Sequence, residues 1–285
     1  MQVAVTIAAA REAALRAGKA GLRVGLVPTM GALHPGHVAL IEESRRLTDF
    51  TAVSIFVNPT QFGPGEDYDR YPRALAEDLR ACEAAGADLV FHPSAEEMYP
   101  RGTAAATFVE VPALSRVFEG AIRPTHFRGV ATVVLALFEI LRPDVAVFGQ
   151  KDFQQQALLR RMTADLHLAT TIVTHPIVRE PDGLAMSSRN VYLTPEQRRA
   201  ALSLHQGLEA ARLAVVAGEA DADRVRRILR APIESQKEAT LDYAEVVDAE
   251  TLGKLDHIET GRSAVALVAA RFGTTRLIDN VRLTE

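Results

Sequence analysis

Two histidines, His34 and His37, are the first residues of this sequence whose type and spacing suggest chemistry. They follow an apolar run at 24–27, which predicts a buried strand, and His37 opens an amphipathic segment that predicts a helix. On the first turn of a helix their spacing places both imidazoles on one side, where free N–H groups and the helix dipole favour an anion. The pattern indicates a phosphate site, although two histidines that only cap a helix would leave the same pattern.

The connection between that strand and helix contains Gly31 and Gly36. Pro28 is expected to end the strand, because proline cannot donate to a sheet ladder. The segment matches neither G-x-G-x-x-G nor G-x-x-x-x-G-K-[ST], so neither a dinucleotide fingerprint nor a Walker loop is predicted.

A lysine, Lys151, follows a second predicted strand at 145–148, within the run Gly149-Gln150-Lys151-Asp152. Where a strand gives way to a helix, a lysine meets a phosphate as a point charge, and the glycine allows the backbone to approach closely. The alternative is a surface lysine next to Asp152, which would cap the following helix.

Two hydroxyl groups and a guanidinium follow one another in Met186-Ser187-Ser188-Arg189, part of the polar segment 179–190. Together these groups suit a polyphosphate. Pro181-Asp182-Gly183 indicates a flexible approach, as a closing loop requires. A polar linker between two domains would have the same composition.

Side-chain amides are the third kind of candidate group. Asn58 and Gln61 follow a predicted strand at 50–57, and Gln155 lies one turn after Lys151. Gln61 and Gln155 suit a small polar substrate, although each is also an ordinary loop or helix residue.

The composition argues against several classes of function. The formal net charge is −4 without a long basic run, so nucleic acid and anionic membranes are not expected as partners. No cluster has metal-ligand spacing, so no protein-bound metal is expected. Cys82 is the single cysteine, and its helical spacing with leucines predicts a packed thiol rather than a nucleophile. The apolar run 130–141 is too short to span a bilayer and no signal peptide is seen, so we expect a cytoplasmic protein.

Strands and helices alternate through the first part of the chain. Helices are expected at 6–17, where Gly18 and Gly21 would end the first one, and at 73–85, 126–141 and 153–166; strands are expected at 24–27, 50–57, 88–91, 108–111, 145–148 and 171–178. This alternation predicts an α/β fold with right-handed βαβ units and a parallel sheet covered on both faces. Because ligands bind such sheets at the carboxyl ends of the strands, residues 28–29, 58–59 and 149–152 are expected to share one crevice.

The pattern changes from Thr194 onward. Thr194 and Pro195 form a helix start, helices continue to about residue 230, and the runs 241–247, 263–271 and 274–279 predict a small antiparallel sheet. We therefore expect two domains, at residues 1–180 and 181–285, of which the second is a smaller α+β domain.

Five separated segments resemble the pantoate–β-alanine ligases, or pantothenate synthetases. They are PTMGALHPGH, SIFVNPTQF, RPTHFRGV, FGQKDFQQ and DGLAMSSRN, in the family's order over nearly the whole chain. The family belongs to the nucleotidyltransferase superfamily, whose H-x-G-H signature is here His34-Pro35-Gly36-His37. The resemblance implies a Rossmann-like N-terminal domain that binds nucleotide and pantoate, a smaller α+β C-terminal lid domain, and a homodimer.

The resemblance also implies a two-step reaction. ATP and (R)-pantoate would give pantoyl adenylate and pyrophosphate, and the amine of β-alanine would then displace AMP to form pantothenate, the vitamin B5 precursor of coenzyme A. The first step builds negative charge on phosphoryl oxygens, which cations and oriented donors stabilise without a covalent nucleophile. Mg²⁺ is expected to arrive with the nucleotide.

Residue roles follow from the resemblance position by position. Contacts to the ATP phosphates would come from His34, His37, Lys151, Ser187, Ser188 and Arg189. The rest of the nucleotide site would be formed by Met30, Gly31, Ala32, Leu33, Pro35, Gly36, Gly149, Gln150, Asp152, Val178 and Met186. Gln61 and Gln155 would hold pantoate with Asn58 nearby, and Arg123 and His126 occur in a family segment close to the site. The MSSR segment lacks the second lysine of the related KMSKS loop, and Arg189 would take its charge role.

Three other classes of protein stay open on the sequence. A nucleotidyltransferase with a phosphate acceptor would call for more basic residues than the amides Gln61 and Gln155. A class I aminoacyl-tRNA synthetase would need a longer chain and a basic surface. A non-catalytic nucleotide sensor would bind ATP without turnover, and it would not need both Lys151 and the two amides.

Overall fold

The structure is a computed structural model that describes residues 1–259 and 261–284. The chain divides into two compact units. The first comprises Met1–Gly149 and Leu158–Pro176, and the second comprises Gln150–Ala157 and the chain from Ile177 onward. The prediction of a boundary between residues 180 and 181 did not anticipate that the short segment after Gly149 would group with the later part of the chain.

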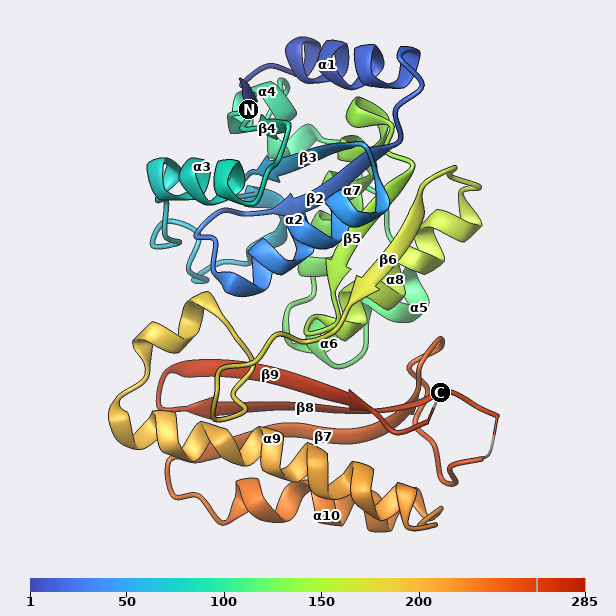
Figure 1. The fold of residues 1–285 in the computed structure, drawn as a ribbon. Coiled ribbons are helices and arrows are strands. Elements are labelled where there is room, and N and C mark those ends of the chain that lie inside the picture. The colour runs from blue at the N-terminus through green and yellow to red at the C-terminus, as the bar shows by residue number, and fades with distance from the viewer. Residues whose placement is uncertain (260, 285) are drawn as a thin grey trace. The chain divides into compact units, whose positions relative to one another are not determined.

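The first unit is built on a six-stranded parallel sheet with the strand order β1-β4-β3-β2-β5-β6 (Figure 1). The strands are β1 (Gln2–Ala4), β2 (Val24–Thr29), β3 (Phe50–Ile55), β4 (Leu89–Phe91), β5 (Val145–Gly149) and β6 (Thr171–His175). From β2 the chain proceeds outward to β3 and β4 and then returns to the other side of β2 with β5. The order therefore reverses between β2 and β5, and the carboxyl ends of these two strands are where an α/β sheet places its ligand.

Helices cover both faces of this sheet (Figure 1). Its helices are α1 (Ile7–Lys19), α2 (Pro35–Leu47), α3 (Leu75–Ala84), α7 (His126–Leu141) and most of α8 (Phe153–Asp165), with short turns α4 (Ala95–Met98), α5 (Pro112–Ser115), α6 (Glu119–Ile122), η1 (Pro59–Gln61) and η2 (Thr103–Ala105). α2 packs with α3, and α1 packs with α7. The helices lie on opposite faces because the crossovers are right-handed. The connections β2–β3 and β3–β4 run across the sheet in one direction, and the connection β4–β5 runs back, so their helices cover different faces. Apolar residues of α2 and α3 pack on valines of β2, β3 and β5.

The second unit combines an antiparallel sheet with two long helices (Figure 1). The strands β7 (Ala239–Asp248), β8 (Ala264–Phe272) and β9 (Thr275–Arg282) pair in that order and form the small antiparallel sheet that the sequence predicts. The helices α9 (Pro195–Val216) and α10 (Ala222–Glu234) pack on each other and on the sheet, and the 3₁₀ turn η3 (Ser188–Tyr192) precedes them. Thr194 caps α9 in a capping box with Gln197, which confirms the predicted helix start.

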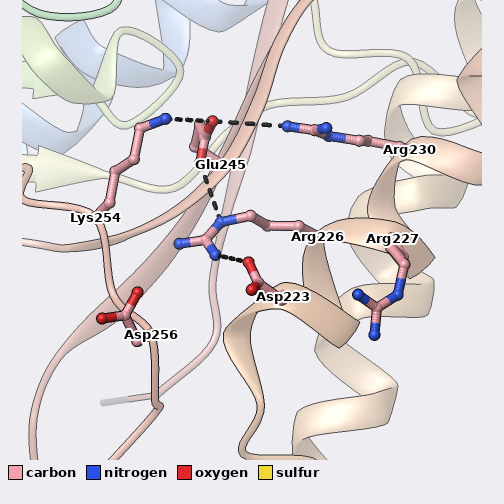
Figure 2. A pocket seen from close by; sticks show the side chains of 7 residues that line it. All are labelled: Asp223, Arg226, Arg227, Arg230, Glu245, Lys254 and Asp256. Atoms are coloured by element: carbon pink, nitrogen blue, oxygen red, sulfur yellow. Dashed lines mark hydrogen bonds and ion pairs between the residues drawn. The ribbon is translucent and has the colours of Figure 1, made fainter.

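A buried carboxylate ties α10 to β7 in this unit (Figure 2). Glu245 Oε2 lies 3.0 Å from Arg226 Nε, and Oε1 lies 2.8 Å from Lys254 Nζ and 3.6 Å from Arg230 Nη2. Arg226 also pairs with Asp223. Glu245 and Arg226 are buried, whereas Lys254 is largely exposed. Burying an unpaired charge costs free energy, so Glu245 can be buried in this unit only because these cations pair with it.

Pro28 does not end strand β2, contrary to expectation. The strand continues to Thr29 in register with β3. The carbonyl oxygen of Thr29 accepts a hydrogen bond from Phe56 on the β3 side. The nitrogen of Pro28 therefore faces the β5 side, where strand pairing ends at Leu26. Proline is tolerated because no donor is needed at that position.

Two further predictions of local structure were wrong, and one short strand was not predicted. The segment 108–111 is not a strand, because side chains of α7 hold it instead: Thr132 accepts a hydrogen bond from the N–H of Val109, and Arg128 lies over the ring of Phe108. Helix α1 continues through Gly18 to Lys19. The edge strand β1 was not anticipated, since three residues carry little periodic signal.

Among the helices that the structure describes, none combines the length and the apolar character needed to cross a membrane.

Candidate active site

The two histidines of the sequence motif lie together at the start of α2. His34 is the N-cap residue, and its Nδ1 accepts a hydrogen bond of 3.1 Å from the N–H of Gly36. The N–H of His34 in turn donates to Nδ1 of His37 at 3.3 Å, which completes a capping box. The ring centroids are 4.0 Å apart. His34 therefore precedes the first turn instead of lying in it, and both histidines cap the helix.

This capping box determines how the two imidazoles present their protons. Each Nδ1 accepts a backbone hydrogen bond, so in the neutral ring the proton is on Nε2. The Nε2–H groups of His34 and His37 are then donors at a helix N-terminus. The helix-capping role and the proposed phosphate role are compatible, because they use different nitrogens.

The loop that leads from β2 to His34 has unusual backbone geometry. Gly31 and Ala32 both have positive φ angles, 85° and 51°. The hydroxyl of Thr29 accepts from the N–H of Gly31 and donates to the carbonyl oxygen of Ser54, at 3.2 and 2.7 Å. The start of the loop is thereby anchored to strand β3.

Gln61 connects this loop to the amide-bearing turn η1. Its side-chain nitrogen lies 2.9 Å from the sulfur of Met30, and its side-chain oxygen accepts from Asn58 Nδ2 at 3.1 Å. Asn58 also donates to the carbonyl oxygen of Gly129 and accepts from the hydroxyl of Tyr99. Asn58 and Gln61 are both buried. The structure thus joins Met30, Asn58 and Gln61 into one hydrogen-bonded group.

Arg123 and His126 contact the backbone of the same glutamine. His126 Nδ1 lies 2.9 Å from the carbonyl oxygen of Gln61, and Arg123 donates to that oxygen at 3.4 Å. Arg123 is paired with Glu66. Burial raises the pKa of Glu66, but the hydrogen bond and charge of Arg123 outweigh it, so the pKa lies below its ordinary value. The sequence analysis did not identify Glu66, because its partner Arg123 is 57 residues away in the sequence.

In the second unit, the backbone around Lys151 is held by strand β9. Asn280 Nδ2 donates to the carbonyl oxygens of Gln150 and Lys151 at 3.0 and 2.9 Å, and Gln150 Nε2 donates back to Asn280 Oδ1 at 3.2 Å. Lys151 and Gln155 are partly exposed and Asp152 is exposed. Sequence reasoning identified Lys151 but not Asn280, because no local pattern links the two segments.

The segment from Val178 to Arg189 folds back on itself. The N–H of Met186 donates to the carbonyl oxygen of Val178, and Glu180 and Leu184 are joined across the intervening turn. Ser187 Oγ accepts from the N–H of Arg189 at the start of η3. The segment is thus a hydrogen-bonded turn that presents Ser187, Ser188 and Arg189 together.

Arg179 anchors this turn to β9. It forms a bidentate pair with the buried Asp279 at 2.7 and 3.0 Å and also donates to the carbonyl oxygen of Gly183. Bidentate geometry fixes the guanidinium in one orientation, so the base of the turn is well defined.

The thiol of Cys82 is not placed to act as a nucleophile. Cys82 is fully buried in α3, which agrees with the expectation of a packed thiol. Within the described ranges 1–259 and 261–284, no group of three or more His, Cys, Asp or Glu side chains has the arrangement of a metal site.

The parallel sheet reverses its strand order between β2 and β5, and the imidazole-capped helix α2 follows β2, so the first unit has a Rossmann-like α/β fold. A family model described as pantoate-beta-alanine ligase matches residues 2–282. The chain belongs to the pantoate-beta-alanine ligase family, and it is a ligase.

Individual relatives are similar to this chain over nearly its whole length. A pantothenate synthetase from Acetivibrio thermocellus is 54% identical over 261 residues, which are 92% of each chain. The crystal structure of pantothenate synthetase from Thermus thermophilus has a TM-score of 0.93 and 46% identity, and covers 100% of both chains. The pantoate-beta-alanine ligase from Francisella tularensis, complexed with beta-gamma ATP and beta-alanine, has a TM-score of 0.79 and 31% identity over 99% of this chain and 98% of that one.

Proposed function

We propose that this enzyme condenses (R)-pantoate with β-alanine at the expense of ATP, through pantoyl adenylate. Family membership along the full chain supports the overall reaction. The single structural observation that carries the proposal is the contact between Gln61 and Met30. It joins the residue expected to hold pantoate to a residue expected to line the adenosine side, as the first half-reaction requires.

The phosphate side of the proposed site uses four kinds of donor. His34 and His37 present Nε2–H groups, and the start of α2 adds the positive end of the helix dipole. Lys151 and Arg189 supply positive charge, and Ser187 and Ser188 supply hydroxyls. Met30, Gly31, Ala32, Leu33, Pro35, Gly36, Gly149, Gln150, Asp152, Val178 and Met186 are proposed to complete the nucleotide site.

The acid side of the proposed site is neutral and hydrogen-bonding. Gln61 and Gln155 would orient pantoate, and Asn58 fixes the side chain of Gln61. Neutral amides fit a hydroxy acid, because they orient its hydroxyl and carboxylate without neutralising the charge that must attack.

In the proposed first step, a carboxylate oxygen of pantoate attacks the α-phosphorus, a new P–O bond forms, and the bond to the pyrophosphate oxygen breaks. The leaving group gains negative charge, which the imidazole, ammonium and guanidinium donors stabilise. In the second step, the β-alanine amine attacks the acyl carbon, AMP departs with the electrons of the acyl–oxygen bond, and the nitrogen loses a proton. No protein side chain becomes covalently attached in either step.

Several finer expectations belong to the same proposal. Mg²⁺ would be held mainly by the nucleotide's phosphates, since this ion keeps several waters and needs few protein ligands. The second unit would act as a lid that excludes water from the reactive anhydride. We also propose that the enzyme works as a homodimer in the cytoplasm.

Isotope exchange between ATP and pyrophosphate tests the proposed function. Exchange is expected to require pantoate and Mg²⁺ but not β-alanine. Lys151→Ala is expected to lower the exchange rate by about a hundredfold, the typical cost of losing a preorganised charge. Absence of exchange, or exchange started by another acid and not by pantoate, would overturn the proposal.

A further inference from the structure

Asp78 is a buried acidic residue without a role in the proposed chemistry. It lies on α3 and is only 2% exposed. Its Oδ2 accepts a hydrogen bond of 2.9 Å from the N–H of Ala32, and its Oδ1 accepts one of 2.7 Å from the N–H of Leu33. Within residues 1–259 and 261–284 the structure pairs no cation with it. The carboxylate is thus compensated by the backbone of one loop.

That loop needs an external restraint. Gly31 and Ala32 have positive φ angles in succession, and a positive φ is unfavourable for alanine. Such a conformation persists only where the surroundings determine it. The two hydrogen bonds that Asp78 accepts come from the strained residue Ala32 and its successor Leu33, and the charge on the acceptor strengthens both.

The residues around the Asp78 carboxylate are consistent with its restraining the loop. A Cβ atom at Gly31 would lie 2.8 Å from Asp78 Oδ2, so the close approach requires glycine there. Leu33, the second donor, immediately precedes His34, whose own N–H and Nδ1 form the capping box. The restraint therefore extends to the residue that directly precedes the histidine pair.

We propose that Asp78 is a positioning residue for the adenylation step, because its carboxylate fixes the loop that places His34 and His37. The proposal rests on the proposed function of the histidines. It does not require Asp78 to touch a substrate. It distinguishes Asp78 from acids that only support the sheet, such as Asp88, whose Oδ2 accepts from the N–H of Thr51 at the opposite, amino-terminal end of β3.

The test compares Asp78→Asn with the matched control Asp88→Asn. An asparagine keeps the shape but offers one oxygen, and its NH₂ group faces a backbone donor. Asp78→Asn is expected to lower pantoate-dependent ATP–pyrophosphate exchange by about a hundredfold, the scale for losing preorganised stabilisation. Aminolysis of supplied pantoyl adenylate by β-alanine is expected to stay within about threefold of wild type, because that step no longer involves the triphosphate. Asp88→Asn is expected to leave both rates within about twofold.

Amide hydrogen exchange gives a readout that is independent of turnover. In Asp78→Asn the amides of Ala32 and Leu33 should lose protection, and the loss should extend to His34 and Gly36. Asp88→Asn should leave these four amides unchanged. If wild-type enzyme showed no pantoate-dependent exchange, the proposed function would fail, while these amides would still show whether Asp78 holds the loop.

A second variant separates positioning from folding. Asp78 and Met30 line a cavity of about 290 Å³, so the extra methylene of Asp78→Glu has room. This variant retains the charge but displaces the carboxylate, and the same selective loss of adenylation is expected. The proposal is overturned if Asp78→Asn exchanges within twofold of wild type, if both half-reactions fall equally, or if neither variant folds.

Discussion

The side-chain amide of Asn280 donates a 2.9 Å hydrogen bond to the carbonyl oxygen of Lys151, across 129 residues of sequence. A second bond reaches the carbonyl oxygen of Gln150, and the side chain of Gln150 returns one. Asn280 is 2% exposed, so water does not readily substitute for it. The position of the Lys151 backbone is thus set by the last strand of the chain.

Asn280→Ala is expected to slow pantoate-dependent ATP–pyrophosphate exchange about tenfold, because two partly buried carbonyl groups lose their donor and Lys151 loses its fixed position. A double-mutant cycle with Lys151→Ala provides the control. In the Lys151→Ala background, Asn280→Ala should cost less than about twofold, since residues that act through one another are not additive. A full tenfold loss in both backgrounds would show that Asn280 acts independently of Lys151.

The sequence predicted those parts of the fold that depend on local patterns. The strand–loop–helix unit around His34, the capped start at Thr194 and the antiparallel C-terminal sheet all have short-range signals, and all are present. The contacts of Asp78 and Asn280 could not be predicted, because each joins segments far apart in sequence that only the tertiary fold brings together. The error at Pro28 has the same origin, since which neighbour its nitrogen faces depends on strand pairing.

His37→Asn should separate the two functions of that imidazole. Asparagine can place an oxygen near the position of Nδ1 and so preserve the capping box, but it has no donor in place of Nε2–H. Exchange is expected to fall by about a hundredfold, whereas the midpoint of thermal unfolding should stay within about 2 °C. His37→Ala is the matched variant, and it should lose both the activity and about 1 kcal/mol of cap stability. Near-normal exchange in His37→Asn would remove the proposed phosphate role.

The buried thiol of Cys82 is expected to make the free energy of unfolding depend on pH in the alkaline range. Burial, followed by the nearby charge of Asp78, raises the pKa of its thiol from 9.0 to about 11. Between these values the unfolded chain has lost the proton and the native protein retains it, so stability falls as pH rises. The difference in unfolding free energy between wild type and Cys82→Ala should shrink by about 2 kcal/mol from pH 8.5 to 11.

Urea denaturation at several pH values measures this difference, and the comparison with Cys82→Ala cancels the titration of tyrosines and lysines. Cys82→Ala should keep its exchange activity, and iodoacetamide should not alkylate the native wild type at pH 8. A parallel pH dependence in the two proteins would contradict the raised thiol pKa.

Glu245 should be far more important for stability than the exposed cation that contacts it. Glu245→Gln leaves Arg226, whose side chain is 10% exposed, without its buried counter-charge. The free energy of unfolding is expected to fall by about 3 kcal/mol, as when one partner of a buried pair is removed. Lys254→Ala is the control, since Lys254 is 63% exposed and such pairs contribute less than about 1 kcal/mol.

Urea titrations at low and high salt distinguish the contributions of Glu245 and Lys254 to stability. The small effect of Lys254→Ala should vanish in 1 M salt, where exposed charges are screened. The effect of Glu245→Gln should persist, because it comes from a guanidinium that salt does not reach. Equal losses in the two variants, or a Glu245→Gln effect that salt removes, would show that the network is a surface feature and not a requirement for packing α10 on β7.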